Sequence, residues 1–226
     1  MSSYGVASEV IEGAFVSAER LLAPLLSLVP STHGADEEVD WRAVHEALGV
    51  RLPSDYTAFM SVYGAGGLGD LGILGPLPVE GLQWDPRNIL EVSPEFRDLW
   101  NSEGGVPGIA ADGGSVLPWG SGCNANELGW LMLDPDPDKW PVVVWRRQIS
   151  YGDSRWKLFD CGMVDFLVRM MSARFDECPL GDASLWGETA PFVHWREEQR
   201  RWLAGLDPET GEPDPIIQDF LQWPAP

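Results

Sequence analysis

The glycines between residues 64 and 69 form the first pattern with a chemical meaning. Gly64, Gly66 and Gly69 fit the spacing G-x-G-x-x-G, which in dinucleotide-binding proteins lets the backbone approach a pyrophosphate. That fingerprint must follow a strand and open a helix, so that the helix N-terminus meets the phosphates. Here a helical pattern precedes the glycines and strand-like sequence follows them. The context therefore favours a helix stop over a phosphate loop, and we expect no cofactor.

Three alternate aspartates form the second pattern. Asp134, Asp136 and Asp138 have the spacing that begins a calcium-binding loop, which also needs a glycine at its sixth position and a glutamate at its twelfth. Those two positions hold Lys139 and Trp145. An acidic, proline-rich turn between two strands explains the triplet better. Such a turn would still project three carboxylates from one place.

Nucleophiles and metal ligands give no recognisable site. The three histidines and three cysteines lie without metal-ligand spacing: His33, His45, His194, Cys123, Cys161 and Cys178. The run from Gly120 to Cys123 is not a G-x-S-x-G nucleophile elbow. Carboxylate pairs carry no information in a chain with 35 acids. We therefore expect no metal and no catalytic residue; a hydrolase would need a deep pocket with convergent polar groups.

Composition narrows the class of partner. The net charge is −20 and the pI is about 4.3, which argues against direct binding to nucleic acid, because phosphate contacts need clustered Lys and Arg. The acidity either keeps the surface soluble and self-repelling or complements a basic partner. An odd number of cysteines without C-x-x-C fits reduced thiols. With no signal peptide and no apolar run of membrane-spanning length, we expect a cytoplasmic protein.

A short helix before the glycines is the clearest structural element. Tyr56, Phe59, Met60 and Tyr63 recur at i, i+3, i+4 and i+7, which is one face of a helix. Pro53 suits the first turn, and Ser54 and Asp55 favour the positive N-terminal end. Gly64 follows at the position of a C-terminal stop.

The rest of the chain alternates from helix to sheet and back. Further helices are expected at about 8–23 (kinked or ended by Pro24), at 41–48 between an Asp40 cap and Gly49, from a Ser93 cap and Pro94 to Gly104, after an Asp160 cap through Met163 to Met171, at 192–204 and at 215–222. Strands are expected at Val116–Trp119, Leu128–Leu133, Val142–Trp145 and Trp156–Phe159, with a strand or hairpin within 69–78. Their short connections favour antiparallel neighbours.

These motifs together resemble the SUKH superfamily, which includes the yeast cell-wall assembly regulator and many bacterial immunity proteins. The first signature is Leu52-Pro53-x-Asp55-Tyr56-x-x-Phe59 followed by Tyr63-Gly64-x-Gly66. The second is Leu117-Pro118-Trp119-Gly120, Gly129-Trp130-Leu131, Trp140-Pro141-Val142-Val143-Val144 and Asp165-Phe166-Leu167. The resemblance implies an α+β domain over residues 40–175, with a twisted antiparallel sheet of about four to six strands and helices packed around it. Residues 1–39 would add an N-terminal helix and linker, and 176–226 a C-terminal helical extension packed on the same domain.

The resemblance also implies a function. A bacterial member typically binds and neutralises a cognate toxin, such as a nuclease, by occlusion; the alternative is a non-catalytic regulatory or scaffold module of the cell-wall regulator type. The family transfers no catalytic or contact residues. A basic toxin domain is the expected partner, and the candidate contacts are acids in predicted turns: Asp70, Glu127, Asp134, Asp136, Asp138 and Asp153.

Overall fold

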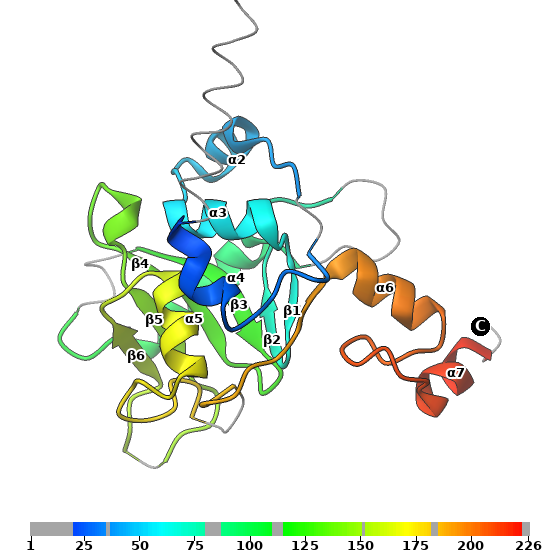
Figure 1. Ribbon diagram of the computed structural model, residues 1–226. Coiled ribbons are helices and arrows are strands. Elements are labelled where there is room, and N and C mark those ends of the chain that lie inside the picture. The colour runs from blue at the N-terminus through cyan, green and yellow to red at the C-terminus, as the bar shows by residue number, and fades with distance from the viewer. Residues whose placement is uncertain are drawn as a thin grey trace, which may run out of the picture.

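A seven-stranded antiparallel sheet organises the molecule (Figure 1). The computed structural model describes residues 20–34, 37–79, 87–109, 115–150, 152–181 and 185–222. The strands are β1 (Gly66–Leu68), β2 (Leu71–Ile73), β3 (Ser115–Gly122), β4 (Glu127–Met132), β5 (Val142–Trp145), β6 (Trp156–Phe159) and β7 (Phe192–His194), in the order β6-β5-β4-β3-β2-β1-β7. The α+β class is confirmed, with one strand more than expected.

The additional strand comes from the C-terminal segment. β7 pairs with β1, with Gly66 opposite His194 and Leu68 opposite Phe192. The sequence predicts a helix over all of 192–204, but the helix begins only at Trp195. The segment expected as a helical extension therefore also supplies an edge strand of the sheet.

Six named helices and one 3₁₀ turn surround the sheet. They are α2 (Trp41–Leu48), α3 (Ser54–Val62), α4 (Ile89–Glu103), the 3₁₀ turn η2 (Pro137–Lys139), α5 (Met163–Met171), α6 (Trp195–Leu203) and α7 (Pro215–Gln222). Residues 20–26 are also helical, so this helix runs past Pro24, while the part expected at 8–19 lies outside the described residues. The helix predicted before the glycines is confirmed as α3.

Two predicted helix starts are wrong. α4 begins at Ile89 and encloses Pro94, because Asn88 accepts a hydrogen bond from the Glu91 N–H at 3.1 Å and caps the helix earlier than Ser93. At α5 the N-cap position is Gly162, and Asp160 is not the cap. The carboxylate at this helix end belongs instead to Asp55 of α3, which accepts from the Val164 N–H at 3.0 Å.

Both faces of the sheet are covered. Alternate residues of a strand point to opposite faces, and Val142 and Val144 of β5 belong to the main core with α3 and α5. Their neighbours Val143 and Trp145 belong to a second, smaller core with Phe96 and Trp100 of α4. The helices α3 and α5 thus cover one face, and α4 covers the other (Figure 1).

The glycine stretch is used for close packing. Gly64 has a φ of +72° directly after α3, so the predicted order of helix, glycine stop and strand is confirmed. A Cβ at Gly66 would overlap the Val193 carbonyl oxygen, and one at Gly64 would lie 2.6 Å from the ring of His194. These two glycines therefore let the backbone of β7 approach β1.

Candidate partner-binding surfaces

The six acids proposed from the sequence divide between the two ends of the sheet. Because neighbouring strands are antiparallel, successive connections alternate between the ends. The β1–β2 turn with Asp70, the start of β4 with Glu127 and the β5–β6 connection with Asp153 share one end, which we call the Asp70 end. The β4–β5 connection carries Asp134, Asp136 and Asp138 at the opposite end. The six acids therefore form no single surface.

The aspartate triplet builds its own turn. The Asp134 carboxylate accepts from the Asp136 N–H at 2.9 Å, and the Asp136 carboxylate accepts from the Asp138 N–H at 3.3 Å. Asp138 in turn accepts from the Ser54 N–H at 2.6 Å, at the positive N-terminal end of α3. The Lys139 Nζ lies 3.8 Å from Asp134 and 3.6 Å from Asp136. These carboxylates hold the turn against α3, so only part of their charge is available to a partner.

At the Asp70 end, the three acids differ in exposure. Asp70 and Asp153 are exposed, whereas Glu127 is largely covered and lies 3.6 Å from the Arg87 guanidinium. Burial raises the pKa of Glu127, against the opposing effect of Arg87. Arg87 also donates to the Ser121 hydroxyl at 3.2 Å. Asp70 and Asp153 are therefore the acids of this end that face solvent.

An open hollow of about 500 Å³ adjoins this end; its lining consists of Arg146, Gln148, Ile149, Ser150, Asp153, Glu177, Cys178 and Gly181. Arg146 is buried, and its guanidinium lies 3.5 Å from Glu177. None of the three histidines contributes to the lining. In the part of the chain that the structure describes, no group of three or more His, Cys, Asp or Glu is placed to hold a metal ion.

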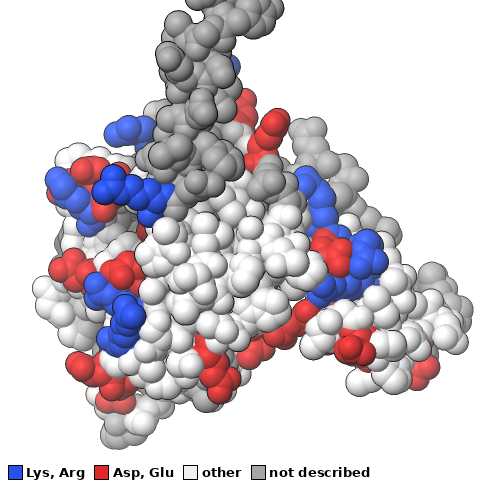
Figure 2. Space-filling model, in the orientation of Figure 1, with Lys and Arg blue, Asp and Glu red and all other residues white. Residues whose placement is uncertain are grey.

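Exposed apolar side chains concentrate elsewhere, on a projection that we call the C-terminal lobe (residues 195–222: α6, its following loop and α7). Among the described residues, seven large apolar side chains are exposed: Leu21, Leu133, Leu158, Leu203, Ile216, Phe220 and Leu221. Four of these seven belong to the lobe. Figure 1 shows α6 leading away from the sheet to α7. Figure 2 shows basic and acidic side chains gathered at the right, over the start of α6, and a mainly uncharged surface with separate acidic patches beyond them at lower right.

Glu37 anchors the start of the lobe. Its carboxylate lies 3.4 Å from the His194 Nε2 and 3.5 Å from the Arg196 guanidinium. It also accepts from the Ala65 N–H at 3.4 Å. Burial would raise the pKa of Glu37, but the hydrogen bonds from His194 and Ala65 outweigh it and leave the pKa lowered. This carboxylate therefore joins β1 to the β7–α6 junction.

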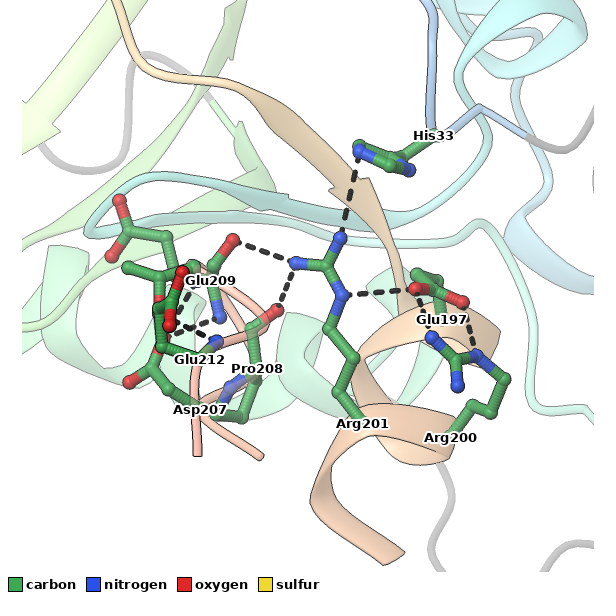
Figure 3. Close-up of polar contacts among 9 residues, drawn as sticks. His33, Glu197, Arg200, Arg201, Asp207, Pro208, Glu209 and Glu212 are labelled. Carbon is green, nitrogen blue, oxygen red and sulfur yellow. Dashed lines mark hydrogen bonds and ion pairs between the residues drawn. The ribbon is translucent and has the colours of Figure 1, made fainter. Parts of the chain in front are cut away.

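Arg201 joins α6 to the loop that follows it (Figure 3). Its Nη1 donates to the carbonyl oxygens of Pro208 and Glu209 at 2.9 and 2.7 Å, and its Nε donates to Glu197 at 2.9 Å. The side chain is buried. A planar guanidinium suits this arrangement because its donors diverge in fixed directions.

The loop then fixes α7. The Asp207 carboxylate accepts from Glu209 and Thr210, and the Asp214 N–H donates to the Gly205 carbonyl at 3.0 Å. The Asp214 carboxylate caps α7 by accepting from the Ile216 N–H at 2.7 Å. Ile217 is the buried residue of this helix. The helix α7 is thus held in a defined position while most of its apolar side chains face solvent.

The lobe was not predicted as a binding surface, although the sequence contains a signal for it. Residues 202–222 include five acids and no Lys or Arg, and Ile216 and Phe220 stand four positions apart. An apolar face beside a one-signed charge run indicates a surface for an apolar and basic partner.

The described helices include none that is both long and apolar enough to cross a membrane.

Comparisons with known proteins add no relative. Comparison of the chain with protein-family models, curated proteins and solved structures gives no match.

Proposed function

We propose that this protein is an immunity-type protein that binds a cognate bacterial toxin domain and neutralises it by occlusion. The observation that carries the proposal is the C-terminal lobe, where four large apolar side chains are exposed on a chain with a net charge of −20. Exposed apolar surface rimmed by polar groups typically marks a protein–protein interface. The signatures within residues 40–175, which resemble those of SUKH immunity proteins, supply the biological class.

The charge suits this role. A toxin that acts on nucleic acid is basic where it holds phosphate, and an acidic protein that covers this region blocks access of the substrate. Opposite potentials raise the rate of association and fix the orientation, while buried apolar anchors supply most of the affinity. No catalytic step is required of the immunity protein.

Co-expression tests the proposal. The product of the neighbouring gene, as the candidate toxin, is expressed in cells with and without the protein, and survival and co-purification are measured. Protection together with a stable complex that weakens as salt is added is the expected result. Equal killing with and without the protein would reject the immunity role. Capture of a cell-wall synthesis enzyme without protection would support the regulatory alternative.

A further inference from the structure

We propose that the C-terminal lobe is the docking surface and that it takes a basic segment of the partner with apolar side chains at its centre. The identity of the partner as a toxin rests on the proposed function, but the chemistry of the docked segment follows from the lobe itself. The segment places its apolar side chains on Leu203, Ile216 and Phe220, and its Lys or Arg side chains on the surrounding carboxylates.

The apolar contacts come from two helices that meet. The exposed fractions are 65% for Leu203, 79% for Ile216 and 60% for Phe220. The rings of Trp202 and Phe220 lie 6.0 Å apart with an interplanar angle of 62°, so α6 and α7 contact each other beside the exposed Phe220. Aromatic residues at the centre of such patches are the usual anchors of a protein interface.

The charges around the patch select a basic occupant. The exposed carboxylates are those of Glu209 and Glu212 in the loop and of Asp219 on α7. Residues 202–222 include no Lys or Arg, and the bases of the lobe, Arg196, Arg200 and Arg201, lie on α6, where they pair with Glu37 and Glu197. A second copy of this chain would bring the same negative charges to the patch and be repelled. Lys and Arg side chains of a partner would instead be attracted by these carboxylates.

The lobe is also preorganised for binding. Arg201, Asp207 and Asp214 fix the loop and the start of α7 through the hydrogen bonds described above. Little conformational entropy is then lost when a partner docks, and this saving appears directly as affinity. The loop of the lobe reaches the β1–β2 turn, where a Cβ at Gly69 would lie 3.6 Å from the Glu209 carboxylate. Asp70 of that turn therefore adds negative charge close to the lobe and contributes to steering.

Binding kinetics with the product of the neighbouring gene, as the candidate toxin, test the inference. The lobe variant carries Ile216→Ser and Phe220→Ser, and a matched control carries Leu133→Ser and Leu158→Ser, which removes two exposed leucines outside the lobe. Circular dichroism and urea unfolding establish that each variant is folded. We expect the lobe variant to weaken the complex at least about tenfold, mainly through faster dissociation, and the control to change it less than about threefold.

A charge variant tests the role of the exposed carboxylates around the apolar side chains. Reversal of Glu209 and Asp219 to Lys is expected to slow association and reduce its salt dependence. A folded lobe variant that binds the toxin with wild-type affinity would overturn the inference and leave the immunity role intact. The inference would also be overturned if wild type sediments as a dimer and the lobe variant as a monomer, because the occupant would then be a second copy.

If the wild-type protein binds no toxin, the proposed function fails and the lobe is tested alone. The probe is a fluorescent 18-residue amphipathic peptide of Leu and Lys, and its control has Glu in place of Lys. Binding of the Lys peptide that the lobe variant loses supports the inference. Equal binding to wild type and lobe variant, or no binding, overturns it.

Discussion

The Asp55 carboxylate of α3 accepts a hydrogen bond from the Val164 backbone N–H of α5 at 3.0 Å, across 109 residues of sequence. The first turn of a helix has backbone N–H groups without partners in the helix itself, and one of them is satisfied here by a second helix. Burial raises the pKa of Asp55, against the effect of the Val164 hydrogen bond. Asp55 therefore has a structural role, which is to hold α3 and α5 together over the main core.

Replacement of Asp55 tests this role. Asp55→Ala removes the acceptor, and we expect a loss of about 1–2 kcal/mol in the free energy of unfolding, the usual effect of deleting a helix cap. Asp55→Asn keeps an acceptor oxygen without the charge and should retain most of the stability. Urea unfolding gives the free energies, and hydrogen exchange at the start of α5 locates the change. Wild-type stability in Asp55→Ala would contradict the assignment.

The acid dependence of stability should distinguish two neighbouring glutamates of α6. The Arg200 hydrogen bond is the largest cause that lowers the pKa of Glu197 to about 2. The folded state thus releases this proton more readily than the unfolded state. The stabilisation is present above about pH 4.5, the ordinary value for Glu, and is lost as the pH falls toward 2. Glu197→Gln should flatten this part of the profile in urea unfolding at a series of pH values.

Glu198 provides a control, because its pKa is shifted in the opposite direction from that of Glu197. Burial raises its pKa, so wild type should lose stability relative to Glu198→Gln as the pH rises through the raised pKa. If the free energy of unfolding changes with pH in the same way in Glu197→Gln and Glu198→Gln, the two carboxylates do not differ as described.

A side chain at Gly66 should separate β7 from β1. In Gly66→Ala the new methyl group would overlap the Val193 carbonyl oxygen, a backbone atom that cannot rotate away. We expect a loss of about 1–3 kcal/mol, typical of overpacking. Gly72→Ala in β2 is the matched control, because its Cβ would lie 3.6 Å from the Ser121 oxygen, an ordinary contact. Equal stability of the two variants in urea would refute the close-packing role.

Arg201 and Arg200 should respond differently to replacement by lysine. Arg201→Lys cannot reproduce the divergent contacts to Pro208, Glu209 and Glu197. These hydrogen bonds are part-buried, and their loss is expected to cost about 1 kcal/mol. Arg200 is exposed and pairs with Glu197 alone, so Arg200→Lys should change the stability little. Thermal unfolding compares them, with hydrogen exchange in residues 205–214 as the local measure. The account fails if that loop exchanges equally in both variants.

Local signals in the sequence were sufficient where neighbouring residues decide the structure. The boundaries of α3 follow from Pro53 and Gly64, and the strand from Val142 to Trp145 follows from its apolar run. The start of α4 was wrong because both Asn88 and Ser93 are good caps, and the buried side chains of Ile89 and Val92 favour the earlier one. Nothing near α5 in the sequence indicates Asp55, because that contact is made only in the folded chain.

The candidate site was less predictable. Acids in turns could be identified, but the sequence does not show that Asp138 is occupied by the Ser54 N–H or that Glu127 is covered. The exposure of Ile216 and Phe220 depends on the loop from Gly205 to Asp214, whose hydrogen bonds direct α7 away from the sheet. An apolar helix pattern alone would equally suit a buried helix.

The pairing of Gly66 with His194 has a consequence for biosynthesis. Strand β1 leaves the ribosome long before its outer partner β7, because residues 69–191 are synthesised between them. Until then β1 is an open edge with unpaired backbone groups, which favours pairing with other chains. Contacts so distant in sequence also form slowly. Translation that stops before residue 192 should therefore yield a product that aggregates, and the segment that carries β7 protects the edge of β1 from such pairing.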